Sequence, residues 1–341
     1  MQLEEALGRL AEGYDLSQTE TRAVFQQVMS GGATPAQIGG LLMAMRVKGE
    51  TVAEIAGAAQ TMRELSTKVN VSDPYLVDTC GTGGSSGAKL FNISTAAAFV
   101  AAAAGAKVAK HGNRKMTSRS GSADVLEAAG VNLTLPPDQI ARCISDVGIG
   151  FIFAQAHHSA MRFAAPVRKE LGVRTMMNVL GPLTNPAGAR RQVIGVFSNV
   201  WQRRLAEVLQ LLDAEHVLVV HSNGLDEIAL DGPSYVVELK NGQISEYQVS
   251  PEDFGISTRS CEALTAESPE ASLKLIKQAL NEPDSAAADL VSLNAGAAIY
   301  AAGVATSLGN GVMMAQDAIS AGLADERLKE LVRISNLMAE S

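Results

Sequence analysis

The first seventy residues carry the polar signals that begin and end short helices. A serine and a threonine are each followed three residues later by glutamate, which is the spacing of a capping box. A threonine–proline pair suits a further helix start, and glycines stand where the apolar stretches end. This pattern predicts an all-helical N-terminal lobe. The capping boxes are Ser17 with Glu20 and Thr51 with Glu54, the threonine–proline pair is Thr34-Pro35, and the glycines are Gly31-Gly32 and Gly49.

Beyond Asp73-Pro74 the pattern changes to short β-favouring runs separated by longer helical or irregular stretches. Such spacing is typical of a mainly parallel sheet flanked by helices. An Asn241-Gly242 turn between alternating residues of 235–249 predicts a hairpin. Residues 94–104, and the chain from about Pro269 onward, are expected to be helical. The β-favouring runs are YLVDTC (75–80), KVAK (107–110), GFIF (150–153), RQVIGVF (191–197) and HVLVVH (216–221).

Composition narrows the class of protein. With 47% hydrophobic but 4% aromatic residues, the core must be built from aliphatic side chains. The formal net charge of −8 argues against nucleic acid and anionic membranes as partners, because both require a basic surface. The cysteines Cys80, Cys143 and Cys261 are odd in number and form no metal-ligand pattern, which suits a reduced compartment. The N-terminus lacks the basic and apolar segments of a signal peptide, so we expect a cytoplasmic location.

The first candidate site is the glycine loop GTGG (81–84), which follows a strand and precedes a helix. Bare backbone N–H groups in such a loop can approach phosphate oxygens, although glycines after a strand also serve tight turns alone. The segment NIST (92–95) places amide and hydroxyl groups at the start of the helix, where they could bind phosphate or simply cap the helix. Each motif on its own is compatible with phosphate binding and with a purely structural turn or cap.

A denser signal is KHGNR (110–114), which follows a strand and continues into MTSRSGSAD (116–124). Cationic side chains and hydroxyl groups this close together can surround a polyanion. The alternative is a solvated polar loop, which the concentration of basic groups in an acidic chain disfavours. The hydroxyl residues are Thr117, Ser118, Ser120 and Ser122.

The acidic pair Asp226-Glu227 follows the apolar run HVLVVH, in the loop HSNGLDEIAL. Adjacent carboxylates at the end of a strand can hold Mg²⁺ together with substrate phosphates and water, although such pairs are also common on surfaces. The adjacent pair His157-His158 has no third ligand spaced nearby and is interpreted as a polar pocket wall. The segment NVLGPLTNP (178–186) contains two prolines and is typical of a hinge or crossover.

Taken together and in this order, these motifs closely resemble the anthranilate phosphoribosyltransferase family, nearly from end to end. The resemblance implies a small all-helical domain, residues 1–73, joined by a crossing segment around 165–187 to a larger α/β domain. That domain, 74–164 and 188–341, would have a mainly parallel central sheet flanked by helices, as in nucleoside phosphorylases. It also implies a homodimer formed through the small domains. The motifs are GTGG, FNIST, KHGNR, SGSAD, AMRFAAPVRKELGVRT, NVLGPLTNP and GLDE.

The resemblance further implies an Mg²⁺-dependent transfer of the phosphoribosyl group from phosphoribosyl pyrophosphate (PRPP) to the amine of anthranilate, a step of tryptophan biosynthesis. Asn113 and Arg168 match positions that contact anthranilate. Lys110, Asp226 and Glu227 would act in catalysis, and Ser94, Asp226 and Glu227 would hold magnesium. The residues implied to bind substrate are Gly81, Thr82, Gly83, Gly84, Ser85, Asn92, Ile93, Ser94, Thr95, Lys110, His111, Gly112, Asn113, Arg114, Ser118, Ser122 and Arg168.

One stretch departs from the family pattern. The family usually has an aspartate directly after GTGG, whereas this chain has Ser85-Ser86 and a loop one residue longer. The altered loop lacks a carboxylate that can position metal-bound diphosphate. The departure predicts a loop that is mobile without ligand, a weaker apparent affinity for PRPP and an altered dependence on magnesium.

Two alternative functions compete with this one. A pyrimidine nucleoside phosphorylase shares the general fold and a related glycine loop, but KHGNR, Arg168 and Asp226-Glu227 better suit a carboxylated acceptor and magnesium pyrophosphate. A non-enzymatic nucleic-acid-binding relative would need a basic surface. The 28 Lys and Arg residues against 36 Asp and Glu residues do not favour one.

Overall fold

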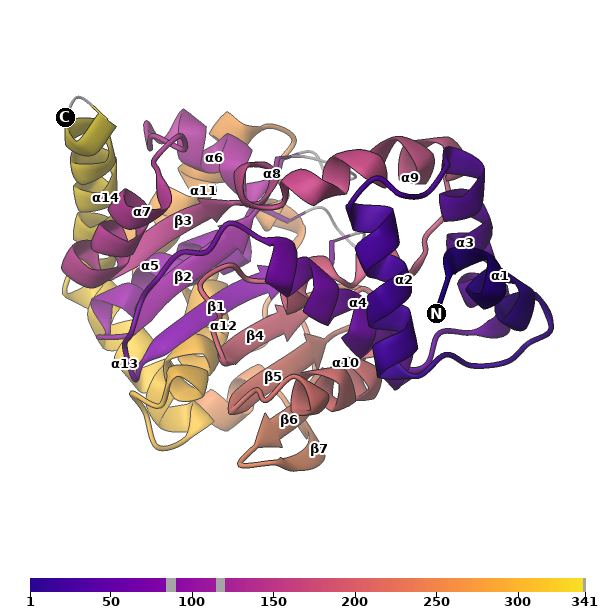
Figure 1. Ribbon diagram of the computed structural model, residues 1–341. Coiled ribbons are helices and arrows are strands. Elements are labelled where there is room, and N and C mark those ends of the chain that lie inside the picture. Colours follow the sequence, from indigo (N-terminus) through magenta and orange to yellow (C-terminus); the bar gives the residue numbers. More distant parts are fainter. Residues whose placement is uncertain (84–89, 115–119, 340–341) are drawn as a thin grey trace.

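The computed structural model describes residues 1–83, 90–114 and 120–339, and it begins with a small helical domain (Figure 1). Both predicted capping boxes are formed, at Ser17 and at Thr51. Thr34 caps the third helix by accepting a hydrogen bond from the backbone N–H of Gln37. Helix α2 packs against α4, and α1 packs against α3. The helices of this domain are α1 (Leu3–Ala11), α2 (Gln18–Met29), α3 (Pro35–Lys48) and α4 (Val52–Leu65).

The larger domain is built on a sheet that has seven strands within the described residues, in the order β3-β2-β1-β4-β5-β6-β7. The strands from β3 to β5 are parallel, and β6 and β7 form an antiparallel hairpin. Each β-favouring run of the sequence forms a strand, so the predicted mainly parallel sheet and hairpin are confirmed. The strands are β1 (Leu76–Gly81), β2 (Lys107–Gly112), β3 (Ile149–Phe153), β4 (Arg191–Gly195), β5 (His216–His221), β6 (Ser234–Lys240) and β7 (Gln243–Val249).

Helices cover both faces of the sheet. Helices α5 and α12 pack on one face together with α11, α13 and α14, whereas α10 covers the other face and also contacts α4 of the helical domain. No helix in the described part of the chain is both long and apolar enough to cross a membrane. The covering helices are α5 (Ile93–Ala103), α10 (Val200–Leu211), α11 (Pro269–Asn281), α12 (Ala286–Ala302), α13 (Leu308–Ser320) and α14 (Leu323–Ala339).

Among the shorter elements, residues 137–147 pack against β2 and β3, and others connect the two domains. Phe163 lies against the end of α2, because a Cβ atom added to Gly31 would come within 2.7 Å of its ring. The chain therefore contacts the helical domain slightly before residue 165, the expected start of the crossing segment. The bounds of the two domains stay a prediction. These elements are α6 (Ser122–Ala128), α7 (Pro137–Arg142), η1 (Cys143–Val147), α8 (Ala154–His157), η2 (Ser159–Phe163), α9 (Ala165–Leu171), η3 (Met176–Asn178), η4 (Gly181–Leu183), η5 (Pro251–Phe254) and η6 (Glu262–Leu264).

The close approach of α2 and α4 depends on Gly57. A Cβ atom at this position would lie 2.4 Å from the carbonyl oxygen of Gln18 and 3.0 Å from the Cβ of Thr21. The partner atom at the shorter distance belongs to the backbone and cannot rotate away. The two helices can therefore cross here only because residue 57 has no side chain.

We expect Gly57→Ala to lower the free energy of unfolding by about 1–3 kcal/mol, since the added methyl group forces the helices apart. Urea unfolding measures the change. Gly8→Ala on α1 is the matched control, because no atom lies within 4 Å of its added Cβ. That substitution should raise stability by about 0.5–1 kcal/mol through the lower chain entropy of alanine. Equal effects of the two substitutions would show that the crossing is not tight.

Candidate active site

Lys110 lies at the centre of the candidate site, where the carboxyl ends of β1 and β2 meet the start of α5. Its ammonium donates hydrogen bonds to the carbonyl oxygen of Thr79 at 2.8 Å and to Oγ of Ser94 at 3.3 Å. The side chain is buried, and this burial lowers the pKa of Lys110, while the negative charges of Asp78 and Glu227 oppose the shift. A buried cation is thereby held beside the first hydroxyl group of α5.

Asp78 supplies a buried acid on β1, one strand away from Lys110. Its Oδ1 accepts a hydrogen bond from the backbone N–H of His111 at 3.1 Å. Burial raises the pKa of Asp78, and the charge of Lys110 lowers it. Sequence reasoning missed this residue, although an aspartate inside the apolar run YLVDTC was an available signal, since buried charges require a partner.

The Asp226-Glu227 loop lies directly against the glycine loop. Oδ2 of Asp226 accepts a hydrogen bond from the backbone N–H of Gly83 at 3.0 Å. A Cβ atom at Gly81 would lie 2.5 Å from the same Oδ2, and one at Gly195 would lie 1.6 Å from the carbonyl oxygen of Asp226. Glycine at 195 is therefore a steric requirement of the site, and glycine at 81 leaves room for the Asp226 carboxylate. Gly195 was not among the predicted residues.

Glu227 completes the contact between this loop and α5. Burial and the neighbouring charge of Asp226 raise the pKa of Glu227 to about 8, while Lys110 and a hydrogen bond from the backbone of Ser94 lower it. Burial likewise raises the pKa of Asp226. Two carboxyl groups that disfavour each other's ionisation in a partly buried position are suited to bind a cation.

The donor set fits magnesium, which prefers carboxylate and hydroxyl oxygens. Asp226 and Glu227 supply carboxylates, and Ser94 supplies a hydroxyl group beside Glu227. Among the residues that the structure describes, no group of three or more His, Cys, Asp or Glu side chains is arranged to hold a metal ion. Further ligands of a cation here would therefore come from water or from a substrate, as is usual for Mg²⁺.

The start of α5 is fixed by contacts on both sides. The side chain of Asn92 accepts a hydrogen bond from Oγ of Ser272 at 2.7 Å and donates one to the carbonyl oxygen of Ser120 at 3.3 Å. Ile93 and Thr95 are buried. Thr82 accepts a hydrogen bond at its hydroxyl group from the backbone N–H of Phe197 at 3.2 Å. Of these residues, Asn92 and Thr82 already have partners without a substrate.

The remaining KHGNR residues follow β2 toward α6. A Cβ atom at Gly112 would lie 2.1 Å from Oγ of Ser122 and 2.8 Å from the ring of Phe151, so a side chain here would displace its neighbours. The carbonyl oxygen of Asn113 accepts a hydrogen bond from the backbone N–H of Ala123 at 3.2 Å. The exposed Arg114 pairs with Glu127 and lies 3.7 Å from Asp124, so its charge is compensated within the protein.

His111 is buried beside His158, with 5.2 Å between the ring centroids. Burial, together with the nearby histidines, lowers the pKa of His111 to about 3 and that of His158 to about 4. His157 is also buried, and its Nδ1 is hydrogen-bonded to the carbonyl oxygen of Thr67 at 2.8 Å. The histidines at 157 and 158 are therefore packed in the interior, which corrects their interpretation as a pocket wall.

Arg168 lies on α9, which packs against α3 of the helical domain. In the sequence it is distant from Lys110 and the residues around it. Its side chain is partly buried, and burial lowers the pKa of the guanidinium. In the described part of the protein this guanidinium has no hydrogen-bond or ion-pair partner, and burial alone shifts its pKa. A half-buried cation without an internal acid is suited to bind an external anion.

The structure thus brings together Gly81, Gly83, Ser94, Lys110, Asp226 and Glu227 through direct contacts. It places Asn113 and Ser122 next to each other, and it gives no contact between Arg168 and these groups. The predicted site residues Gly84, Ser85 and Ser118 lie outside the described residues, as does Ser86 of the altered loop.

Family models match both parts of the chain. Residues 4–66 match the helical bundle domain of a glycosyl transferase family, and residues 73–325 match the a/b domain of that family. The anthranilate phosphoribosyltransferase of Hahella chejuensis is 57% identical, over 100% of this chain and 99% of the relative. That of Teredinibacter turnerae is 57% identical, over 99% and 100%. The chain belongs to the anthranilate phosphoribosyltransferase family.

Solved structures agree with this assignment and with the predicted fold. The anthranilate phosphoribosyltransferase of Thermus thermophilus has a TM-score of 0.92 and 44% identity, covering 97% of this chain and 99% of the other. The enzyme of Saccharomyces cerevisiae, solved in complex with PRPP and Mg, shares the fold at a TM-score of 0.87 and 24% identity, covering 98% of each chain. The predicted enzyme class is confirmed, and neither alternative function is favoured.

The lowered pKa values of His111 and His158 predict a pH dependence of stability. Their folded pKa values lie below the ordinary value of 6.5, so their contribution to stability is present above pH 6.5 and is lost as the pH falls toward about 4. We expect the free energy of unfolding to fall less steeply between pH 6.5 and 4.5 in His158→Asn, by about 1 kcal/mol per pH unit. Urea unfolding across this range measures the slope. Parallel curves for the two proteins would contradict the account.

Proposed function

We propose that the cluster around Lys110 is the site at which this protein transfers the phosphoribosyl group of PRPP to the amine of anthranilate. The reaction itself is that of the family, and it yields N-(5-phosphoribosyl)anthranilate and pyrophosphate. The observation that carries the proposal is the convergence of Gly83, Ser94, Lys110 and the Asp226-Glu227 pair at one edge of the sheet. Ligands of open α/β sheets bind at the carboxyl ends of the strands, where these residues lie.

In this proposal each part of the cluster has its own role. The glycine loop and the start of α5 bind the phosphate groups through backbone N–H and hydroxyl groups. Lys110 supplies positive charge next to the departing pyrophosphate, on which negative charge accumulates in the transition state. Asp226, Glu227 and Ser94 hold magnesium, which when bound neutralises charge on the diphosphate. The remaining predicted substrate contacts, including His111, Asn113, Arg114 and Ser122, belong to the same proposal.

The acceptor is bound from the side of the helical domain. The guanidinium of Arg168 can pair with the planar carboxylate of anthranilate through two parallel hydrogen bonds. Asn113 offers an amide on the side of the larger domain. Because an aromatic amine is already neutral at pH 7, its attack on C1′ requires orientation more than deprotonation.

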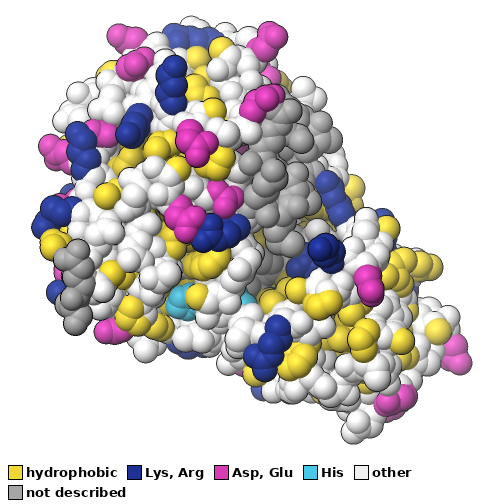
Figure 2. Space-filling view, turned by 90° about the horizontal axis from the view of Figure 1, so that it is seen from above, with side chains coloured by type: hydrophobic (Ala, Val, Ile, Leu, Met, Phe, Trp, Pro, Cys, Tyr) yellow, Lys and Arg dark blue, Asp and Glu magenta, His cyan; other side chains and the backbone are white. Residues whose placement is uncertain are grey.

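We also propose a cytoplasmic homodimer formed through the helical domain. This domain exposes large apolar side chains, including Val47 at 81% and Tyr14 at 60% of their surface, as expected at a contact between subunits. Nucleic acid is not a proposed partner, because acidic and basic side chains are interspersed on the face shown in Figure 2. Light scattering gives the mass in solution, and a monomer would contradict the dimer.

The direct test of the function is the loss of anthranilate fluorescence on addition of PRPP, with and without Mg²⁺. We expect consumption that requires both PRPP and Mg²⁺ and releases one pyrophosphate for each anthranilate consumed. Consumption of anthranilate should stop when the metal is removed with a chelator and resume when Mg²⁺ is restored. No consumption at any magnesium concentration would overturn the proposed function.

Replacing both acids, as Asp226→Asn with Glu227→Gln, should lower turnover and raise the magnesium concentration needed for half-maximal rate. Loss of metal ligands removes the charge that holds the cation, while the amide groups keep similar shapes. The magnesium dependence of the rate measures the effect, and circular dichroism confirms the fold. Asp231→Asn, at an exposed position in the same connection, is the control. If the double variant has the magnesium dependence of the control, the acids are not ligands.

Arg168→Ala should raise the KM for anthranilate by about tenfold or more, since a bidentate charge-assisted pair contributes about 1.5–3 kcal/mol. The KM for PRPP should change far less. Lys169→Ala on the same helix, at an exposed position, controls for a general effect of removing a cation from α9. Equal weakening of both substrates in Arg168→Ala would instead indicate a structural role.

A further inference from the structure

One side chain, that of Asn294, forms hydrogen bonds with both backbone polar groups of Ile228, the residue directly after the acidic pair. Oδ1 of Asn294 accepts a hydrogen bond from the backbone N–H of Ile228 at 2.9 Å, and its Nδ2 donates one to the carbonyl oxygen of Ile228, also at 2.9 Å. Nδ2 donates a second bond to the carbonyl oxygen of Leu290 on its own helix. Asn294 is buried, with 3% of its surface exposed.

The neighbouring peptide groups are also held by side chains rather than by a strand pairing. Oγ of Ser222 donates a hydrogen bond to the carbonyl oxygen of Glu227 at 2.7 Å. The backbone N–H of Ala229 donates one to Oγ of Ser234 at 2.8 Å. The backbone of residues 227–229 therefore takes its position from three neutral side chains. Among them only Asn294 comes from the helical layer that covers the sheet.

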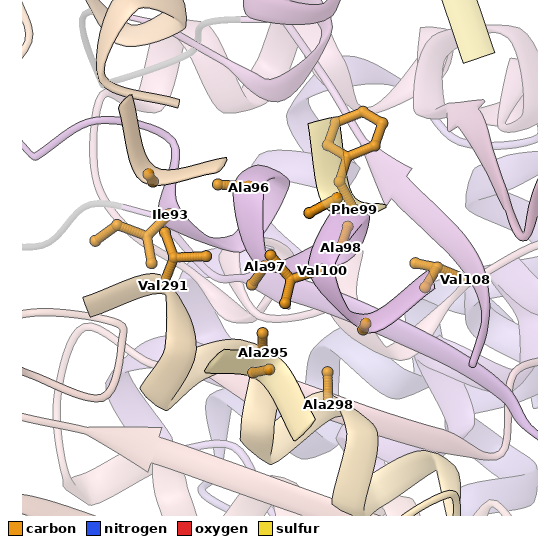
Figure 3. Packing of buried hydrophobic residues seen from close by; sticks show 14 of the residues in the cluster. Ile93, Ala96, Ala97, Ala98, Phe99, Val100, Val108, Val291, Ala295 and Ala298 are labelled. Atoms are coloured by element: carbon orange, nitrogen blue, oxygen red, sulfur yellow. The ribbon is translucent and has the colours of Figure 1, made fainter. Parts of the chain in front are cut away.

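The helix that carries Asn294 is itself closely fitted into the core. A Cβ atom at Gly296 would lie 2.6 Å from the backbone nitrogen of Val312, so α12 and α13 are in backbone contact there. Small side chains likewise bring α12 against α5, whose second residue is Ser94. One pair of packed helices thus supports both sides of the proposed cation site. Figure 3 shows this packing, with Val291, Ala295 and Ala298 of α12 beside Ile93, Ala97 and Val100 of α5.

The amide of asparagine suits this position for two reasons. It supplies a donor and an acceptor, so neither polar group of Ile228 is buried without a partner, an omission that would cost about 1–3 kcal/mol for each. It is also neutral, whereas an acid here would add a negative charge behind two carboxylates. The donated bond to the Ile228 carbonyl would then become a repulsion between oxygens.

We propose that Asn294 is a positioning residue for the reaction. It fixes the backbone that carries Asp226 and Glu227, and so sets where their carboxylates stand relative to Gly83 and Ser94 and how tightly they hold Mg²⁺ with the diphosphate. This inference rests on the proposed function, in which the two acids are the cation ligands. It adds a residue that does not touch the substrate but determines the affinity for the cation.

The test compares wild type with Asn294→Asp, which keeps an acceptor for the Ile228 N–H and removes both donated bonds. We expect the half-saturating Mg²⁺ concentration of the reaction to rise about tenfold, as for other groups that orient metal ligands. The KM for anthranilate should not change. Binding of Mn²⁺ in the presence of pyrophosphate, followed by electron paramagnetic resonance, should weaken by a similar factor. Hydrogen exchange of peptides covering residues 225–230 should become faster.

Ser335→Ala is the matched control. It removes the hydrogen bond that Oγ of the buried Ser335, far along the chain on α14, accepts from the backbone N–H of Asn132 at 3.0 Å. It should lower stability and leave Mg²⁺ dependence and Mn²⁺ binding unchanged. If Asn294→Asp does not fold, Asn294→Ser retains one hydrogen-bonding group and should give a smaller shift in the same direction.

Wild-type values of both metal readouts in the Asn294 variants, or an equal shift in Ser335→Ala, would overturn the inference. Failure of the proposed function gives a distinct result, because the wild type would then consume no anthranilate at any Mg²⁺ concentration. Mn²⁺ binding and hydrogen exchange would still test whether Asn294 positions the loop.

Discussion

The structure of the larger domain depends on the burial of one positive charge, the ammonium of Lys110, near the acids Asp78 and Glu227. Lys110 lies in the carboxyl-terminal half of β2, in the parallel part of the sheet, and its ammonium donates hydrogen bonds to Thr79 and Ser94 and lies near the acids Asp78 and Glu227. A charge in such a position is tolerated only with compensation. The compensating acids come from β1 and from the loop after β5, so the charge ties together strands that are far apart in the sequence.

The site also depends on glycines at positions where a side chain would collide with a neighbouring segment. Gly81 and Gly195 leave room for Asp226, and Gly112 leaves room for Ser122. Behind the sheet, α5 and α12 approach through small side chains and present Ser94 and Asn294 at the two sides of the acidic loop. The site is therefore assembled from short, rigid contacts of the larger domain. Arg168 alone among the described candidates stands on α9 and connects the helical domain to the proposed chemistry.

Much of this architecture was predictable because its signals are local. Capping boxes, the Asn241-Gly242 turn and the β-favouring runs each depend on neighbouring residues, and the helices and strands formed as expected. The roles of Gly195 and Asn294 were not predictable in this way, and the local signal at Asp78, an acid inside the apolar run YLVDTC, did not identify its partners. Each follows from a contact between residues distant in sequence, such as Gly195 with Asp226. The motif residues of the site were recognisable only as an ordered set, since each motif alone also suits a turn, a cap or a solvated loop.

The most direct test of the central interaction is a double-mutant cycle of Lys110→Met and Asp78→Asn, followed by urea unfolding at pH 8. The asparagine can still accept the bond from the His111 N–H, so the cycle isolates the effect of charge. Loss of the cation alone should destabilise the protein by about 3–5 kcal/mol, because it leaves buried acids uncompensated. The same loss should be smaller by at least about 1 kcal/mol when residue 78 is already neutral. Additive effects, within about 0.5 kcal/mol, would contradict the view that these charges hold the site together.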